Sequence, residues 1–167
     1  MKQGFIKVAA ITPKIKVADA KYNGQLMRTY MKDAEKAGAK IVVFPELSIT
    51  GASCGDLFFQ SKLLKAAKEE LMQLVSASKF YDAIYFVGMP YVINGKLYNV
   101  AVAISKGEVL GIVPKTYVRD ARWFATGAGL DTEEVLPNGQ IVPVSTDLIF
   151  YCNEVENLKI AVEIGED

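Results

Sequence analysis

The expected architecture follows from one short run of residues, Lys40-Ile41-Val42-Val43-Phe44-Pro45-Glu46-Leu47. Residues 40–44 are mostly apolar and rich in β-branched side chains, which is typical of a strand buried within a sheet. Pro45 ends that strand, and Glu46 places a carboxylate just beyond its carboxyl end. Open α/β sheets bind their ligands at that edge. The run therefore predicts a layered fold and marks a candidate site within it.

The segments around this run alternate between helix and strand patterns. Apolar or small residues recur at helical spacing in two stretches, which predicts amphipathic helices over residues 19–38 and 63–78. Short apolar stretches predict further strands at residues 5–12 and 84–87.

The pattern then changes to antiparallel pairs. Asn94-Gly95 is a strong signal for a two-residue turn joining strands at 91–93 and 96–104. The remaining expectations are a strand at 108–113, a turn-rich region at 125–143 and a last, mostly apolar strand at 158–164. Together these elements predict an α/β (or α+β) layered domain with a mixed sheet.

The composition is that of one cytosolic domain. With 167 residues, 51% of them hydrophobic, the chain is long enough for a single core. Lysine and arginine number 19, as do aspartate and glutamate, so no net field attracts nucleic acid or an anionic membrane. No segment approaches the roughly 20 apolar residues of a membrane span, and no signal peptide is recognisable. We therefore expect a cytoplasmic protein without nucleic-acid or membrane partners.

The chain contains no histidine. This excludes Ser-His-Asp and Cys-His couples and any zinc site built on histidine. Cys54 and Cys152 are too few for a disulfide scaffold and too far apart for a CxxC motif, so no metal site is expected. A catalyst in this chain must use carboxylate, lysine, thiol or hydroxyl groups.

Candidate chemistry lies at three strand ends. Glu46 could act as a general base, although a strand-end glutamate is as readily a solvated or capping group. Lys115, after an apolar strand and a proline, could stabilise an oxyanion, although most such lysines are surface charges. Gly165 lies at a sharp turn after an apolar strand, where a nucleophile elbow would sit, but glycine has no nucleophile. Cys54 is either a loop thiol nucleophile or a half-buried structural cysteine.

Three motifs resemble the nitrilase, or carbon–nitrogen hydrolase, superfamily in their order and spacing. They read Phe44-Pro45-Glu46-Leu47, Val113-Pro114-Lys115-Thr116-Tyr117 and Val162-Glu163-Ile164-Gly165-Glu166-Asp167. The resemblance covers nearly the whole chain. It implies a nitrilase-like αββα sandwich with mixed sheets and a Glu-Lys-Cys triad, which requires no histidine.

Other motifs are similar to the glutaminase domain of glutamine-dependent NAD synthetases. They read Thr50-Gly51-Ala52-Ser53-Cys54-Gly55-Asp56-Leu57-Phe58, Leu97-Tyr98-Asn99-Val100-Ala101, Arg122-Trp123-Phe124 and Thr146-Asp147-Leu148. This resemblance implies a domain that releases ammonia from L-glutamine and passes it to an ATP-dependent NAD synthetase domain. ATP and Mg would act in that synthetase domain, which is absent here, and this domain would use no cofactor. A homo-oligomer is also implied.

The resemblance assigns a role to each matching position. Glu46 would be the general base, Lys115 the oxyanion stabiliser and residue 165 the position of the nucleophilic cysteine. Tyr117 and Glu166 would contact the substrate. Gly165 departs from the pattern at the nucleophile itself, and covalent catalysis needs an acyl carrier that neither Glu46 nor Lys115 can replace. We therefore expect the chain to be inactive as it stands.

Further departures bear on the domain assignment. The loop at 118–121 is several residues shorter than in the family, and Ala52 replaces a common aromatic residue. The chain also stops directly after an apolar strand, so residues 1–167 are expected to be the N-terminal part of a truncated nitrilase-like domain. Two other functions stay open: a free-standing amidase of the same superfamily, and a non-catalytic nitrilase-like scaffold that only binds a partner or ligand.

Overall fold

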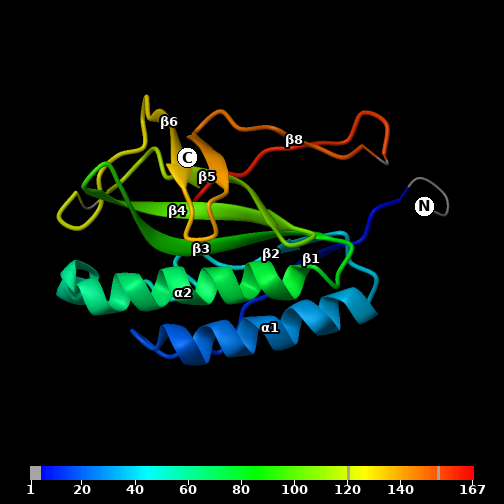
Figure 1. Cartoon of the computed structure of the whole chain (residues 1–167), viewed down its shortest axis with the longest axis horizontal. Coiled ribbons are helices and arrows are strands. Elements are labelled where there is room, and N and C mark those ends of the chain that lie inside the picture. Colours follow the sequence, from blue (N-terminus) through cyan, green and yellow to red (C-terminus); the bar gives the residue numbers. More distant parts are fainter. Residues whose placement is uncertain (1–4, 120, 154) are drawn as a thin grey trace.

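The computed structural model describes residues 5–119, 121–153 and 155–167, and its centre is a seven-stranded mixed sheet. The strand order is β1-β2-β3-β4-β5-β7-β6 (Figure 1). The strands are β1 (Val8–Ala10), β2 (Ile41–Val43), β3 (Ile84–Ile93), β4 (Lys96–Ser105), β5 (Glu108–Pro114), β6 (Asp131–Val135) and β7 (Ile141–Ser145). Strands β1, β2 and β3 are parallel, β4 is antiparallel to β3 and β5, and β7 pairs parallel to β5 and antiparallel to β6.

Two helices cover one face of this sheet, α1 (Ala20–Lys36) and α2 (Ser61–Ser78), and they lie side by side in Figure 1. Helix α1 begins where the Asp19 carboxylate accepts the Tyr22 N–H at 3.0 Å, which satisfies one of the unpaired donors of its first turn. A short 3₁₀ helix, η1 (Gly55–Phe59), precedes α2. The main core lies between helices and sheet and includes Met27, Met31, Leu71, Leu74, Tyr85, Val87 and Val102.

The C-terminal segment crosses the other face of the sheet (Figure 1). It contains a two-stranded sheet of β8 (Phe150–Tyr151) and β9 (Lys159–Ile160). Phe150 packs there against Phe86, with ring centroids 5.6 Å apart, and against Ala103 and Val113. After this second, smaller core, the chain continues to the carboxyl ends of β2 and β5.

The mixed α/β class, the two helices and the Asn94-Gly95 hairpin are confirmed. The third strand, however, is longer than predicted: β3 runs unbroken from Ile84 to Ile93 instead of ending at 87. Phe86 and Gly88 direct their carbonyls to the β2 side of β3, so by alternation the Pro90 nitrogen faces that side and not β4. Pro90 is tolerated there because β2 pairs only with Ile84, Tyr85 and Phe86.

Three other predicted segments differ from the structure. Residues 125–143 are not only turns, because β6 lies within them and β7 begins there. The charged residues of β6 and the proline of β7 break the apolar alternation that predicts a strand, so this edge hairpin was not predicted. Residues 158–164 form a strand only at Lys159–Ile160, since Val162 and Ile164 pack their side chains without backbone pairing. The strand expected at 5–12 is limited to β1.

Neither helix in the described parts of the chain is long and apolar enough to cross a membrane.

Candidate active site

The carboxyl ends of β2 and β5 lie at the same edge of the sheet, because two antiparallel pairings separate β3 from β5. Glu46 follows β2, and its loop lies directly on β3 at Gly88. A Cβ added to Gly88 would stand 2.5 Å from the Leu47 nitrogen, so any larger residue would push the loop away. The Ile49 N–H donates to the Gly88 carbonyl at 3.1 Å and fixes this approach.

Leu47, the residue after the glutamate, has a left-handed backbone with φ of 53°. This conformation costs a bulky residue about 1–2 kcal/mol. The tight turn explains it, because the Leu47 carbonyl accepts the Gly51 N–H at 2.7 Å. Strain of this kind persists where the surroundings impose it and tends to gather at functional sites.

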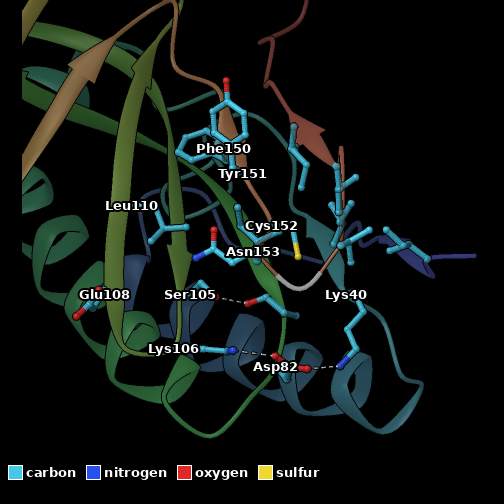
Figure 2. Close-up of a pocket in the computed structure, with 17 residues that line it drawn as sticks. Lys40, Asp82, Ser105, Lys106, Glu108, Leu110, Phe150, Tyr151, Cys152 and Asn153 are labelled. Carbon is cyan, nitrogen blue, oxygen red and sulfur yellow. Dashed lines mark hydrogen bonds and ion pairs between the residues drawn. The ribbon is translucent and has the colours of Figure 1, made fainter. Parts of the chain in front are cut away.

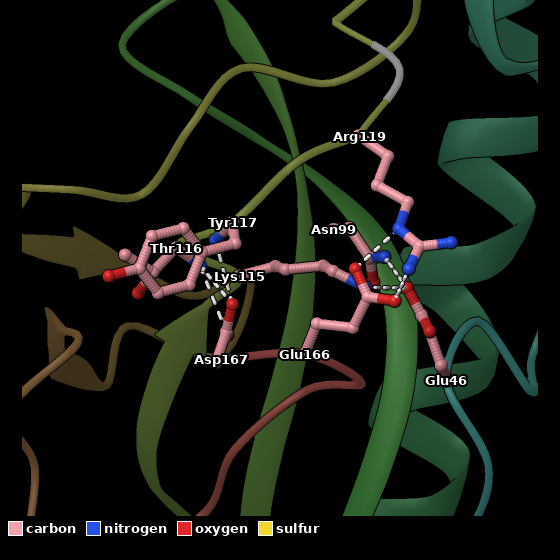
Figure 3. Close-up of polar contacts among 8 residues, drawn as sticks. All are labelled: Glu46, Asn99, Lys115, Thr116, Tyr117, Arg119, Glu166 and Asp167. Atoms are coloured by element: carbon pink, nitrogen blue, oxygen red, sulfur yellow. Dashed lines mark hydrogen bonds and ion pairs between the residues drawn. The ribbon is translucent and has the colours of Figure 1, made fainter.

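Glu46 and Lys115 form an ion pair at this edge (Figure 3). The Lys115 Nζ lies 2.8 Å from Glu46 Oε1, and the two side chains are 14% and 36% exposed respectively. The Asn99 amide donates to the same carboxylate oxygen at 2.5 Å. The Lys115 N–H in turn donates to the Asn99 carbonyl at 2.8 Å, so the three residues form one connected group.

Gly165 faces this pair. A Cβ built on its backbone would lie 2.8 Å from Lys115 Nζ and 3.5 Å from Glu46 Oε2, and its φ is 65°. A cavity of about 220 Å³ is lined by Glu46, Ala101, Gly165 and their neighbours. A side chain at this position would therefore contact both charged groups at once.

The turn at Gly165 is attached to the strand end that carries Lys115. The Asp167 carboxylate accepts the N–H groups of Thr116 at 3.0 Å and Tyr117 at 2.7 Å. Arg119 forms an ion pair with Glu166 beside them (Figure 3). These contacts join the segment after β5 to the C-terminal turn, although the two are far apart in the sequence.

The loop after Glu46 packs against residues 122–124. The Asp56 carboxylate accepts from the Arg122 guanidinium at 3.0 Å and from Trp123 Nε1 at 3.1 Å. Phe58 is fully buried and meets Phe124 edge to face, with centroids 4.8 Å apart. Cys54 is buried as well, and this burial raises the pKa of its thiol. Its location is that of a structural cysteine.

The structure thus brings Glu46, Lys115 and Gly165 together, with Glu166 adjacent in the chain. Tyr117 differs, since its backbone N–H takes part while its ring points away from the pair, and the residue as a whole is 64% exposed (Figure 3). Asn99 and Arg119 were missed by the sequence reasoning. The signal for Asn99 was an amide within an otherwise apolar strand.

A larger cavity of about 540 Å³ lies elsewhere, between the sheet and β8–β9 (Figure 2). None of Glu46, Lys115 or Gly165 lines it. In the described residues, no group of three or more His, Cys, Asp or Glu side chains is placed to hold a metal ion.

The chain belongs to the carbon-nitrogen hydrolase family, which matches residues 7–165. It is 34% identical to the glutamine-dependent NAD(+) synthetase of Mycobacterium tuberculosis over 172 aligned residues, which cover 99% of this chain and 25% of that protein. Over 78 residues, it is 40% identical to the synthetase of Aquifex aeolicus, covering 47% of this chain and 14% of that one. The resemblance to this group is confirmed. The chain spans about a quarter of the length of the Mycobacterium tuberculosis synthetase.

Solved structures support the same fold. A glutamine-dependent NAD(+) synthetase from Cytophaga hutchinsonii superposes with a TM-score of 0.82 at 23% identity, covering 93% of this chain and 27% of that one. An amidase from Nesterenkonia sp. superposes with a TM-score of 0.66 at 16% identity, covering 87% and 56% of the two chains. At these identities the likeness establishes the nitrilase-like fold alone.

Proposed function

We propose that this chain is the frame of a glutamine-hydrolysing site that supplies ammonia to an NAD synthetase and that lacks its nucleophile. One observation carries the proposal: a side chain at position 165 would start 2.8 Å from Lys115 Nζ and 3.5 Å from Glu46 Oε2. A thiol there would have a base on one side and a cation on the other. The similarity to glutamine-dependent NAD(+) synthetases along the whole chain supports the choice of glutamine.

The chemistry that such a site performs follows from these positions. A thiolate at residue 165 attacks the side-chain amide carbon of glutamine, and Glu46 takes the thiol proton. The Lys115 ammonium stabilises the negative charge that develops on the amide oxygen. The proton held by Glu46 passes to the leaving nitrogen, and ammonia departs. Glu46 then takes a proton from water, which attacks the thioester and releases glutamate and the thiol.

With Gly165 in place, no acyl intermediate can form, and we propose that the chain does not hydrolyse glutamine as it stands. The site needs no metal in this scheme, because Lys115 already supplies the positive charge. The Tyr117 and Glu166 assignments as substrate contacts remain proposals, and for Tyr117 the ring would have to turn toward the site.

The partners belong to the same proposal. The names of the relatives support NAD synthesis as the use of the ammonia. We propose an ATP-dependent synthetase domain as its recipient, with ATP and Mg acting there. A cytoplasmic location and a homo-oligomeric assembly are proposed with it.

The experiment is to introduce Gly165→Cys into the full-length protein and to measure ammonia release from L-glutamine. Gly165→Ser and Gly165→Ala serve as matched controls, because both add a Cβ without a thiol. Ammonia release by the cysteine variant, with none from the parent or the alanine variant, supports the proposal. A folded cysteine variant that releases none contradicts it.

A non-catalytic binding function is the second candidate, and Gly165 itself favours it. The Glu46–Lys115 pair is kept although the nucleophile is not. Calorimetric titration of the parent with L-glutamine tests this candidate. Binding by the parent, combined with an inactive cysteine variant, would favour it over the enzyme.

A further inference from the structure

Two buried asparagines offer a comparison within one chain. Asn23 is fully buried, and its side chain uses both polar atoms on the backbone. Its Oδ1 accepts the Lys16 N–H at 2.7 Å, and its Nδ2 donates to the carbonyls of Lys16 at 2.8 Å and Ile49 at 2.9 Å. Asn23 is therefore explained by the fold, because it holds two loop segments against α1.

Asn99 is 4% exposed, but its bonding is different. Its Nδ2 donates to Glu46 Oε1 at 2.5 Å, while its Oδ1 has no hydrogen-bond partner among the described residues. A buried acceptor left unpaired is unfavourable, and an apolar side chain of similar shape would avoid that penalty. The fold alone thus gives no reason for an amide here, and the contact with Glu46 does.

The backbone of Asn99 is engaged as well. Its carbonyl accepts the Lys115 N–H at 2.8 Å, one residue past the end of β5. The side chain of Asn99 therefore holds Glu46 while its main chain holds Lys115. Asn99 thus contacts both members of the ion pair, one through its side chain and the other through its main chain.

The two oxygens of Glu46 are consequently unequal. Oε1 accepts from both the Asn99 amide and the Lys115 ammonium, whereas Oε2 is the oxygen nearest to a side chain at position 165. The neutral amide of Asn99 holds Glu46 Oε1 without adding a second positive charge beside Lys115 or a negative charge beside Glu46.

We propose that Asn99 is a positioning residue that holds Glu46 Oε1, so that Oε2 faces residue 165 and takes the proton of the nucleophile. This inference rests on the proposed function, since it assigns Glu46 the part of the base. It goes beyond that function by naming what orients the base.

Alkylation tests the inference without requiring any hydrolysis. The thiol introduced by Gly165→Cys is treated with iodoacetamide over a range of pH, and mass spectrometry separates its reaction from that of Cys54 and Cys152. Adding Asn99→Leu should slow alkylation at neutral pH at least tenfold and move the acidic limb of the pH–rate profile to higher pH, because Glu46 Oε2 is no longer held toward the thiol and takes its proton less readily. Asn138→Leu, an exposed asparagine in the β6–β7 turn, is the matched control and should change neither.

A double-mutant cycle separates positioning from a general structural effect. In the presence of Glu46→Gln, Asn99→Leu should have little further effect on alkylation, because it acts through the carboxylate. Equal effects of Asn99→Leu with and without Glu46 would overturn the proposal, as would an unchanged profile in the first comparison. Melting curves of every variant check the fold.

Hydrolysis gives a second readout. If Gly165→Cys restores ammonia release, Asn99→Leu should lower kcat about 10²-fold with little change in KM, as expected for a displaced base. A matching loss confined to KM would overturn the proposal. If Gly165→Cys restores no release, the proposed function fails, while the alkylation cycle still decides the role of Asn99.

Discussion

Lys115 lies within contact distance of any side chain placed at position 165. The Lys115 Nζ is 2.8 Å from the position that a Cβ at residue 165 would occupy, and real Cβ atoms almost never lie that close to another heavy atom. The group in the way is the far end of a flexible side chain rather than backbone. A residue at 165 would therefore displace Lys115 slightly and remain in contact with it.

This relationship predicts the effect of Gly165→Ala on stability. The backbone of Gly165 is left-handed, so alanine should lower the free energy of unfolding by about 1–2 kcal/mol, measured by chemical denaturation. Gly139→Ala is the control, since Gly139 is also left-handed, with φ of 83°, but has nothing near its Cβ position. The loss at 165 should equal or exceed the loss at 139. A Gly165→Ala variant as stable as the parent would contradict the assigned backbone conformation.

Asp167 is predicted to hold the segment after β5 in place. Asp167→Ala removes a charged acceptor from the Thr116 and Tyr117 N–H groups, and such bonds contribute about 1.5–3 kcal/mol. Hydrogen exchange at these two amides should therefore become roughly tenfold to a hundredfold faster. Glu156→Ala, at an exposed position, should leave both amides unchanged. Equal protection in the two variants would show that Asp167 does not carry this contact.

Asp82 predicts a dependence of stability on pH. It lies at one end of the larger cavity, where hydrogen bonds from Lys40 and Lys106 hold the pKa of its carboxyl below the ordinary 3.8 (Figure 2). Because the pKa is lower in the folded chain than in the unfolded chain, the pairing stabilises the fold above about pH 4. That contribution is lost as the pH falls through the lowered pKa.

The substitution Asp82→Asn should therefore lower the free energy of unfolding at pH 7 but not near pH 2. The carboxyl is half exposed, so solvent screening limits the loss to a few tenths of a kcal/mol up to about 1 kcal/mol. Urea unfolding at the two pH values measures the difference. The same loss at both would mean that charge is not its cause.

The site was easier to predict from the sequence than some of the strands. Glu46 and Lys115 each follow an apolar run and a proline, and parallel strands bring such ends to one edge. Strand β6 could not be recognised, because an edge strand carrying Asp131 and Glu133 lacks the apolar alternation on which periodicity depends. Strand β6 forms because β7 pairs with it, and that pairing depends on the assembled fold.

Other parts of the site depend on tertiary contacts that no local pattern encodes. Asn99 meets Glu46 across 53 positions of sequence, and Gly88 matters only because the Glu46 loop lies on it. The ion pair between Arg119 and Glu166 joins two segments that are 47 positions apart in the sequence. These contacts exist only in the folded chain, because each joins segments that are distant in the sequence.

The central proposal is that residue 165 occupies the position of a nucleophile, with Glu46 beside it as the base and Lys115 as the cation. Its most direct test is the rate of ammonia release from L-glutamine by the full-length Gly165→Cys variant, with and without Lys115→Met. We predict release in the first case and a loss of about 10²–10³-fold in kcat in the second, as when an oxyanion stabiliser is removed. Folded Gly165→Cys protein that releases no ammonia, or release that does not depend on Lys115, would contradict the claim.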